Sequence, residues 1–170
     1  MAGYGLPKEQ HLSVVLQNSL ELEGHNIEII NGSVSGSTSS GGLNIADWTL
    51  SENNIDLMIL CLGANDMLRG INPKETKNNL EEIIKIAKSK NIKIIIAGMI
   101  APTSYGFEYK KSFDQIFSDL SKKYRLQLIP FLLEGVAQKP EFNLSDGMHP
   151  NDQGTIIIGN TLKKAILKNL

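Results

Sequence analysis

Apolar residues recur along the chain with two different spacings, and these predict helices and strands in alternation. Stretches with an apolar residue at every third or fourth position are expected to be amphipathic helices. The expected buried helix faces are Leu12, Val15, Leu16 and Leu20; Leu80, Ile83, Ile84 and Ala87; Phe113, Ile116, Phe117, Leu120 and Tyr124; and Ile158, Leu162 and Ile166. A further short helix is expected over residues 43–50, with Ile45 and Trp48 facing inward.

Contiguous apolar runs predict short buried strands between these helices. The runs cover residues 27–30, 55–62, 92–100 and 126–131. The run at 55–62 is typical of a strand in a parallel sheet that is covered on both faces. Strands that alternate with helices predict a parallel sheet with helices on both sides. Because no repeat, low-complexity tract or linker interrupts the pattern, we expect one domain over residues 1–170.

The pattern opens on a helix, without a strand in front of it. In the flavodoxin-like strand order 2-1-3-4-5 the first strand lies inside the sheet, between two neighbours. Its loss would leave backbone donors and acceptors unpaired on both of them. We therefore expect the sequence to begin one strand late, so that the domain is incomplete at its N-terminus.

Composition excludes several classes of function. The 170 residues carry 17 Lys and Arg against 18 Asp and Glu, a net charge of −1, so bulk charge does not favour nucleic acid or an anionic membrane. No apolar run approaches the ~20 residues that cross a bilayer. The single cysteine, Cys61, excludes an internal disulfide, and its place in an apolar run favours core packing over nucleophilic chemistry. Residues 1–7 lack the apolar core of a secretory signal, which leaves the compartment open.

The segments that follow predicted strands carry the candidate chemistry, because sites in parallel sheets form where strands end. Asp146 and His149 are three residues apart ahead of the last helix. This spacing lets a carboxylate reach the imidazole Nδ1, fix its tautomer and make it a general base. The same spacing also fits a loop aspartate that caps the helix beside a surface histidine. A metal site is less favoured, since the other histidines, His11 and His25, have no ligand pattern around them.

Asn65 and Gly36 lie in polar loops that follow predicted strands. Asn65 comes directly after the run 55–62, where its amide can donate to a developing oxyanion, although Gly63-Ala-Asn-Asp is also ordinary turn composition. Gly36 lies in the Ser/Gly-rich loop 32–42, where a free backbone N–H can serve the same oxyanion, or the loop is simply flexible. The loop lacks the phosphate-binding Walker pattern. None of its serines, at positions 33, 35, 37, 39 and 40, has the setting of a nucleophile elbow.

Taken together, these segments resemble the SGNH (GDSL-type) hydrolases, and in particular their bacterial lysophospholipase, acyl-CoA thioesterase and arylesterase members. The matching blocks, in chain order, are Ala2-Gly-Tyr-Gly-Leu-Pro7, Asn31-Gly-Ser-Val-Ser-Gly-Ser-Thr38, Leu62-Gly-Ala-Asn-Asp-Met-Leu-Arg-Gly70 and Asp146-Gly-Met-His-Pro-Asn151. They place the family's glycine on Gly36, its asparagine on Asn65, its acid on Asp146 and its base on His149. The resemblance covers essentially the whole chain.

The resemblance implies a flavodoxin-like α/β/α sandwich and acyl transfer from a small ester or thioester to water, with neither cofactor nor metal. It implies that His149 takes the proton of a serine nucleophile while Asp146 orients the imidazole. The Gly36 N–H, the Asn65 amide and the serine N–H would hold the oxyanion. Residues 100–106 are similar to a substrate-side loop of these enzymes, which makes Tyr105 a candidate for the acyl pocket, unless this is a plain surface loop.

The serine itself is the departure from the family pattern. In the family, Gly-Asp-Ser-Leu precedes the first matched block, which places the nucleophile two residues before Met1, and no internal serine fits its place. We therefore expect Met1 to be an internal methionine of a longer protein. The alternatives are a non-catalytic binding domain that keeps the pocket, and a flavin- or phosphate-binding protein that uses the Ser/Gly loop. The second alternative gives no role to Asp146 and His149.

Overall fold

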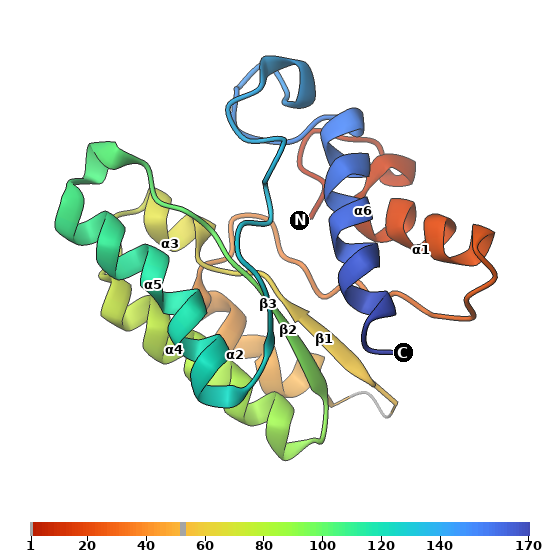
Figure 1. Cartoon of the computed structure of the whole chain (residues 1–170), viewed down its shortest axis with the longest axis horizontal. Helices are drawn as coiled ribbons and strands as arrows, with labels where there is room; N and C mark the ends of the chain where they lie inside the picture. Colours follow the sequence, from red (N-terminus) through yellow and green to blue (C-terminus); the bar gives the residue numbers. More distant parts are fainter. Residues whose placement is uncertain (1, 52–53) are drawn as a thin grey trace. The chain divides into compact units, whose positions relative to one another are not determined.

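The computed structural model describes residues 2–51 and 54–170 (Figure 1). Met1, Glu52 and Asn53 lie outside the described residues. The expectation that Met1 is an internal methionine of a longer protein therefore also falls outside them. The described chain forms two compact units: Gly36–Phe131, and Met1–Ser35 together with Leu132–Leu170. The expectation of a single domain stays a prediction.

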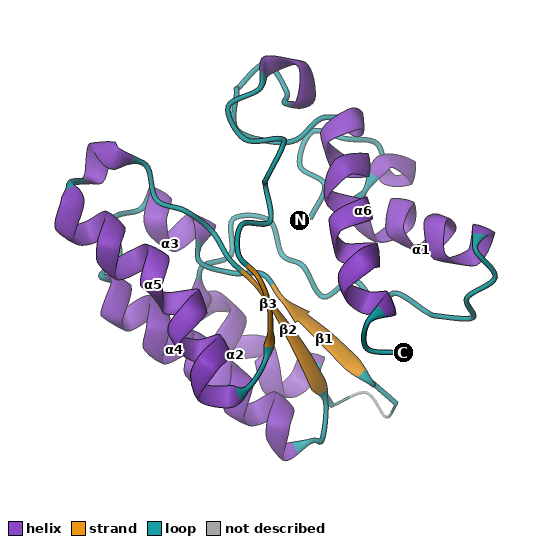
Figure 2. Cartoon of the chain, viewed as in Figure 1, coloured by secondary structure: helices purple, strands orange, loops and turns teal. Residues whose placement is uncertain are grey.

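The unit Gly36–Phe131 is built on a parallel sheet (Figure 2). Its strands are β1 (Leu57–Leu60), β2 (Lys93–Ala97) and β3 (Gln127–Ile129), in the order β1-β2-β3. Ile96 of β2 pairs with Leu60 of β1 on one side and with Leu128 of β3 on the other. Each of these strands lies within a run predicted from the sequence.

The helices of this unit include α2 (Ser39–Thr49), α3 (Ala64–Leu68), α4 (Pro73–Ser89) and α5 (Phe107–Tyr124), with a 3-10 turn η2 (Thr103–Tyr105). Helices α4 and α5 lie beside each other against the sheet, and α2 lies against α4 (Figure 1). Helices α4 and α5 bury the predicted apolar stripes, except that Tyr124 of α5 is only half-buried. The alternation of strand and helix thus gives the predicted parallel α/β arrangement.

The start of helix α4 is fixed by residues close to it in the chain. The Asn72 side chain accepts a hydrogen bond from the Lys74 N–H at 2.9 Å, and Pro73 occupies the first helical position. The apolar stripe then enters the core, where Leu80 and Ile84 are fully buried. This burial, rather than helix propensity alone, stabilises the helix.

Trp48 corrects one prediction, because its side chain is 79% exposed instead of facing inward. Helix α2 begins at Ser39, four residues before the expected start at position 43, and it buries Ala46. A residue two positions further along a helix is rotated by roughly 200°. Trp48 therefore lies on the face opposite Ala46.

The run 55–62 was expected to be buried on both faces, yet only Leu60 of strand β1 is buried and the other strand residues are half-buried. Within the described part of the sheet, β1 is an edge strand that pairs with β2 alone. An edge strand keeps one side open to water, which accounts for the lower burial.

The second unit is centred on two helices that lie side by side, α1 (Leu12–Leu22) and α6 (Asp152–Leu167) (Figure 1). Leu16, Leu20, Ile158 and Leu162 form its buried apolar contacts. Lys163 of α6 donates to the Glu23 carboxylate at 2.5 Å and to the Ser19 hydroxyl at 2.8 Å, which ties the two helices at their polar edge. The unit also contains the 3-10 turns η1 (Lys8–Gln10) and η3 (Pro140–Phe142). Within the described ranges, none of the helices has the length and apolarity that a membrane crossing requires.

The strand predicted over residues 27–30 is absent, and the segment is irregular. The Gln17 side chain of α1 replaces a neighbouring strand: its amide donates to the Ile27 carbonyl and its carbonyl accepts from the Ile29 N–H. A strand exists only by pairing with another strand, and no described strand pairs with this segment. Its apolar composition was therefore insufficient evidence for a strand.

Candidate active site

Asp146 and His149 form one tight turn ahead of α6. One carboxylate oxygen, Oδ1, accepts the backbone N–H groups of Met148 at 2.8 Å and His149 at 3.0 Å. The other oxygen, Oδ2, lies 2.7 Å from the His149 Nδ1. The carboxylate therefore holds both the backbone and the ring of the histidine, as the three-residue spacing predicted.

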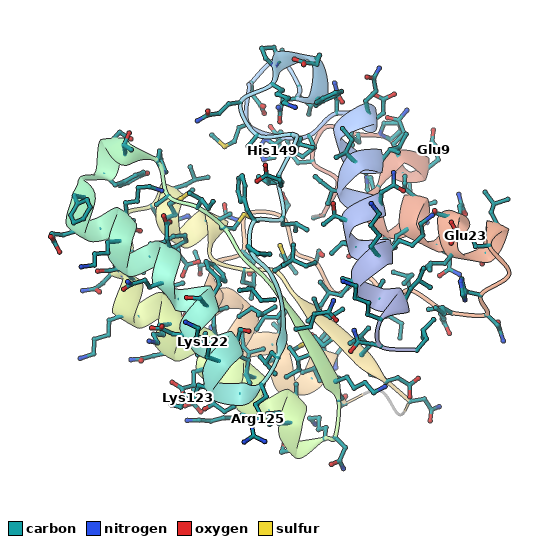
Figure 3. All side chains as sticks on the ribbon, viewed as in Figure 1. Glu9, Glu23, Lys122, Lys123, Arg125 and His149 are labelled. Carbon is teal, nitrogen blue, oxygen red and sulfur yellow. The ribbon has the colours of Figure 1, made fainter. Side chains whose placement is uncertain are left out.

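This geometry sets the protonation of both groups. An ionised carboxylate only accepts hydrogen bonds, so the proton of the neutral imidazole is on Nδ1, which leaves Nε2 as a free acceptor. The hydrogen bonds from His149 and Met148 stabilise the charged form and lower the pKa of Asp146 from 3.8 to about 2. Asp146 is thus a fixed negative charge at neutral pH, and the side chains of His149 and Asp146 stay 41% and 40% exposed. His149 is labelled in Figure 3.

The low pKa of Asp146 gives a prediction that is independent of any activity. A carbon-detected NMR titration of the folded chain should give a midpoint near pH 2 for Asp146. The turn is then stabilised, relative to the unfolded chain, above pH 3.8 and loses this stabilisation as the pH falls through about 2. In His149→Ala the midpoint should rise only part of the way to 3.8, because the backbone N–H groups of residues 148 and 149 remain. An unchanged midpoint in this variant would contradict the hydrogen bond between the imidazole and the carboxylate.

Neighbouring residues hold this turn in place. The Asn151 side chain caps α6 by accepting from the Gly154 N–H, and its amide donates to the Glu141 carbonyl at 2.9 Å. Residues 143 and 150 form an antiparallel bridge that closes the loop. The ring of Tyr4 lies over the imidazole of His149, with 4.4 Å between ring centroids.

Gly36 and Asn65 come together in the other unit, through the backbone of the Ser/Gly loop. The Asn65 amide donates to the Ser37 carbonyl at 3.0 Å, one residue beyond Gly36. Gly36 has a φ of +74°, a conformation that glycine adopts without strain. Its N–H has no acceptor among the residues that the structure describes. The loop thus has a free donor beside the Asn65 amide.

A buried carboxylate at Asp66 supports this loop, and the sequence analysis did not identify it. Asp66 is fully buried and accepts the Ser39 N–H at 2.7 Å, the Ser39 hydroxyl, and the Thr76 hydroxyl at 3.2 Å. Interpreting Gly63-Ala-Asn-Asp as a turn hid the short helix α3 that carries it. The signal available was a second polar residue soon after a run predicted to be a buried strand, where an unpaired carboxylate would be costly.

The four predicted site residues therefore form two pairs, Asp146 with His149 and Gly36 with Asn65. The pairs belong to different units of the chain. Among the described residues, no group of three His, Cys, Asp or Glu side chains has an arrangement suited to a metal ion.

Comparison with known proteins gives the family. The sequence model of the GDSL-like lipase/acylhydrolase family matches residues 1–155. The chain belongs to this family.

Curated relatives of this acylhydrolase carry enzyme names. The chain is 34% identical to an arylesterase of Vibrio mimicus, over 99% of this chain and 84% of the relative. It is 32% identical to thioesterase 1/protease 1/lysophospholipase L1 of Escherichia coli, over 81% of this chain and 66% of the relative. The resemblance inferred from the sequence blocks is thereby confirmed, and the chain is an ester-hydrolysing serine hydrolase by family.

The fold of this acylhydrolase is also confirmed. The crystal structure of the psychrotrophic esterase EstA from Pseudoalteromonas sp., inhibited by monoethylphosphonate, matches with a TM-score of 0.93 at 31% identity. The match covers 98% of this chain and 91% of that chain. The chain therefore has the mixed α/β fold of the SGNH hydrolases.

No described serine of the acylhydrolase hydrogen-bonds the imidazole of His149. Cys61, directly after β1, is no substitute nucleophile, because burial raises the pKa of its thiol and so disfavours the thiolate.

Residues 100–106, expected to resemble a substrate-side loop, end in an aromatic stack. The Tyr105 and Tyr109 rings are 5.1 Å apart, and the Tyr109 hydroxyl donates to the Ile71 carbonyl at 3.0 Å. Phe107 at the start of α5 is 74% exposed. The acyl-pocket role of this loop stays a prediction.

Proposed function

We propose that this chain supplies the base, the acid and two oxyanion donors of a serine hydrolase acting on small carboxylic esters or thioesters. The observation that carries the proposal is the Asp146–His149 pair, in which a carboxylate of lowered pKa fixes the Nδ1 proton and leaves Nε2 free. Family membership and the enzyme names of its relatives support the reaction class.

In the proposed reaction, Nε2 of His149 takes the hydroxyl proton as the serine oxygen attacks the acyl carbonyl. The tetrahedral intermediate collapses when His149 returns this proton to the leaving alcohol or thiol, and an acyl-enzyme remains. Water then attacks the acyl-enzyme by the same route, releasing the carboxylic acid and the serine. Asp146 stabilises the imidazolium in both halves without taking the proton itself.

We assign the developing oxyanion to two neutral donors, the Gly36 N–H and the Asn65 amide. The Gly36 N–H has no acceptor among the described residues. The Asn65 amide has two N–H groups, and one of them donates to the Ser37 carbonyl. The second N–H of Asn65 is therefore left for substrate. Neutral donors placed before the reaction cost no reorganisation when the negative charge forms.

The nucleophile in this proposal is a serine on a Gly-Asp-Ser-Leu segment directly ahead of the first matched block. We call a protein with an apolar strand and this segment joined ahead of Met1 the extended enzyme. The strand is taken from one of the relatives named above.

The decisive experiment compares the 170-residue chain with the extended enzyme. The chain alone should show no hydrolysis of p-nitrophenyl butyrate above background and no labelling by a fluorophosphonate probe. The extended enzyme should do both, and its serine-to-alanine variant should do neither. Parallel assays with butyryl-CoA then decide between ester and thioester preference.

Two outcomes would contradict the proposal. Turnover by the 170-residue chain that survives careful purification would mean that another residue is the nucleophile. A folded extended enzyme that binds substrate without hydrolysing it would favour the alternative of a non-catalytic binding domain, which the enzyme names of the relatives do not support.

A further inference from the structure

We propose that Arg69 is a positioning residue of the oxyanion site, which orients the Gly36 peptide by holding its carbonyl group. The proposal rests on the proposed function for its catalytic consequence, but its structural part does not depend on activity. The Arg69 guanidinium donates from Nη2 to the Gly36 carbonyl at 2.9 Å.

Three side chains, those of Asn65 and Asp66 in α3 and of its C-cap residue Arg69, hold three successive peptide groups of the Ser/Gly loop. Arg69 binds the carbonyl of Gly36, Asn65 binds the carbonyl of Ser37, and Asp66 binds the N–H of Ser39. These are the peptide groups between residues 36 and 37, 37 and 38, and 38 and 39. The loop is therefore fastened to α3 at each of these groups in turn, and Arg69 makes the outermost contact.

The outermost contact matters because it adjoins a glycine. With φ at +74°, Gly36 joins the peptide that carries its free N–H to the peptide held by Arg69. A Cβ at this position would meet nothing closer than the Arg69 Nη2 at 3.8 Å, so glycine is required by the backbone angle and not by lack of space. Glycine resists rotation less than any other residue, so an external hydrogen bond has to fix its orientation.

The inner and outer contacts differ in what their removal does. Asp66 is fully buried with three hydrogen bonds, so its replacement threatens the fold. Arg69 is exposed, and its replacement leaves the bonds of Asn65 and Asp66 in place. An Arg69 variant therefore separates the orientation of Gly36 from the stability of the unit.

The structural test uses the 170-residue chain. In Arg69→Met the backbone amide resonances of Gly36 and Ser37 should shift and exchange with solvent faster, while that of Ser39 should stay unchanged. Arg125→Met is the matched control, because it removes the same charge from the C-terminal end of α5, a separate part of the same unit (Figure 3). Unchanged Gly36 and Ser37 resonances in Arg69→Met would overturn the proposal, whatever the protein's activity.

The kinetic test uses the extended enzyme. Arg69→Met should lower kcat on the order of tenfold with KM within about twofold, less than the ~10²–10³ lost with an oxyanion donor. Added guanidinium ion should restore part of kcat in Arg69→Ala and leave the Arg125→Met control unaffected. A raised KM with unchanged kcat would mean that Arg69 binds the substrate directly, which would overturn the proposal.

The two proposals fail in distinguishable ways. If His149→Ala is as active as the parent extended enzyme, the proposed function is wrong, and the amide resonances still decide the role of Arg69. If His149→Ala is inactive and Arg69→Met keeps its full kcat, the role of Arg69 alone is wrong.

Discussion

Replacing His149 by alanine in the extended enzyme should lower kcat for p-nitrophenyl butyrate by at least about 10³-fold, because it removes the general base that accepts the serine proton. The Nε2 of His149 is the acceptor that the Asp146 hydrogen bond leaves free. Steady-state kinetics measure kcat, and the rate of labelling by a fluorophosphonate probe is the second readout. Labelling should slow together with kcat, since both depend on serine activation.

His25→Ala is the matched control for this prediction. His25 follows α1 in the same unit, and its backbone N–H donates to the Leu20 carbonyl at 3.1 Å. Its replacement should leave kcat unchanged. A His149→Ala variant that keeps more than a tenth of the parent activity would exclude His149 as the general base.

Replacing Asn65 by alanine should lower kcat by about 10²–10³-fold, the usual cost of losing one oxyanion donor. Among the described residues the Asn65 amide bonds only the Ser37 carbonyl, so the free energy of unfolding should fall by only about 1 kcal/mol. Urea unfolding followed by circular dichroism, measured beside the kinetics, separates these two effects.

Asn65→Asp sharpens the result, because it keeps the size of the side chain and removes both amide donors. We expect it to be at least as inactive as Asn65→Ala. Asn44→Ala, at an exposed position of α2, should behave like the parent enzyme. An active Asn65→Asp variant would show that the oxyanion is held elsewhere.

Helices and turns whose interacting residues lie close together along the chain were predictable from the sequence. The stripe of Leu80, Ile83 and Ile84 has the 3.6-residue period of a helix face, and Asn72-Pro73 marks where that helix begins. The Asp146–His149 turn was equally local, since its hydrogen bonds span three residues. In each case the interacting atoms are close along the chain, so spacing alone constrains them.

Predictions failed where a residue depends on a distant partner. Residues 27–30 are as apolar as a strand, but Gln17 takes their backbone bonds where a strand neighbour is lacking. Trp48 lies outside because the helix buries Ala46 on its other face. Neither outcome is encoded in the local composition.

The sequence by itself determined the parallel α/β class, most of the helices and the Asp146–His149 pair, because apolar period and short-range spacing act within a few residues. Only the tertiary structure decided how Asp66 and Arg69 hold the loop at Gly36. Those bonds join residues 27 and 33 positions apart, and no pattern along the chain records which donor meets which acceptor. The orientation of a free N–H is a property of packed neighbours, and packing is set only when the chain has folded.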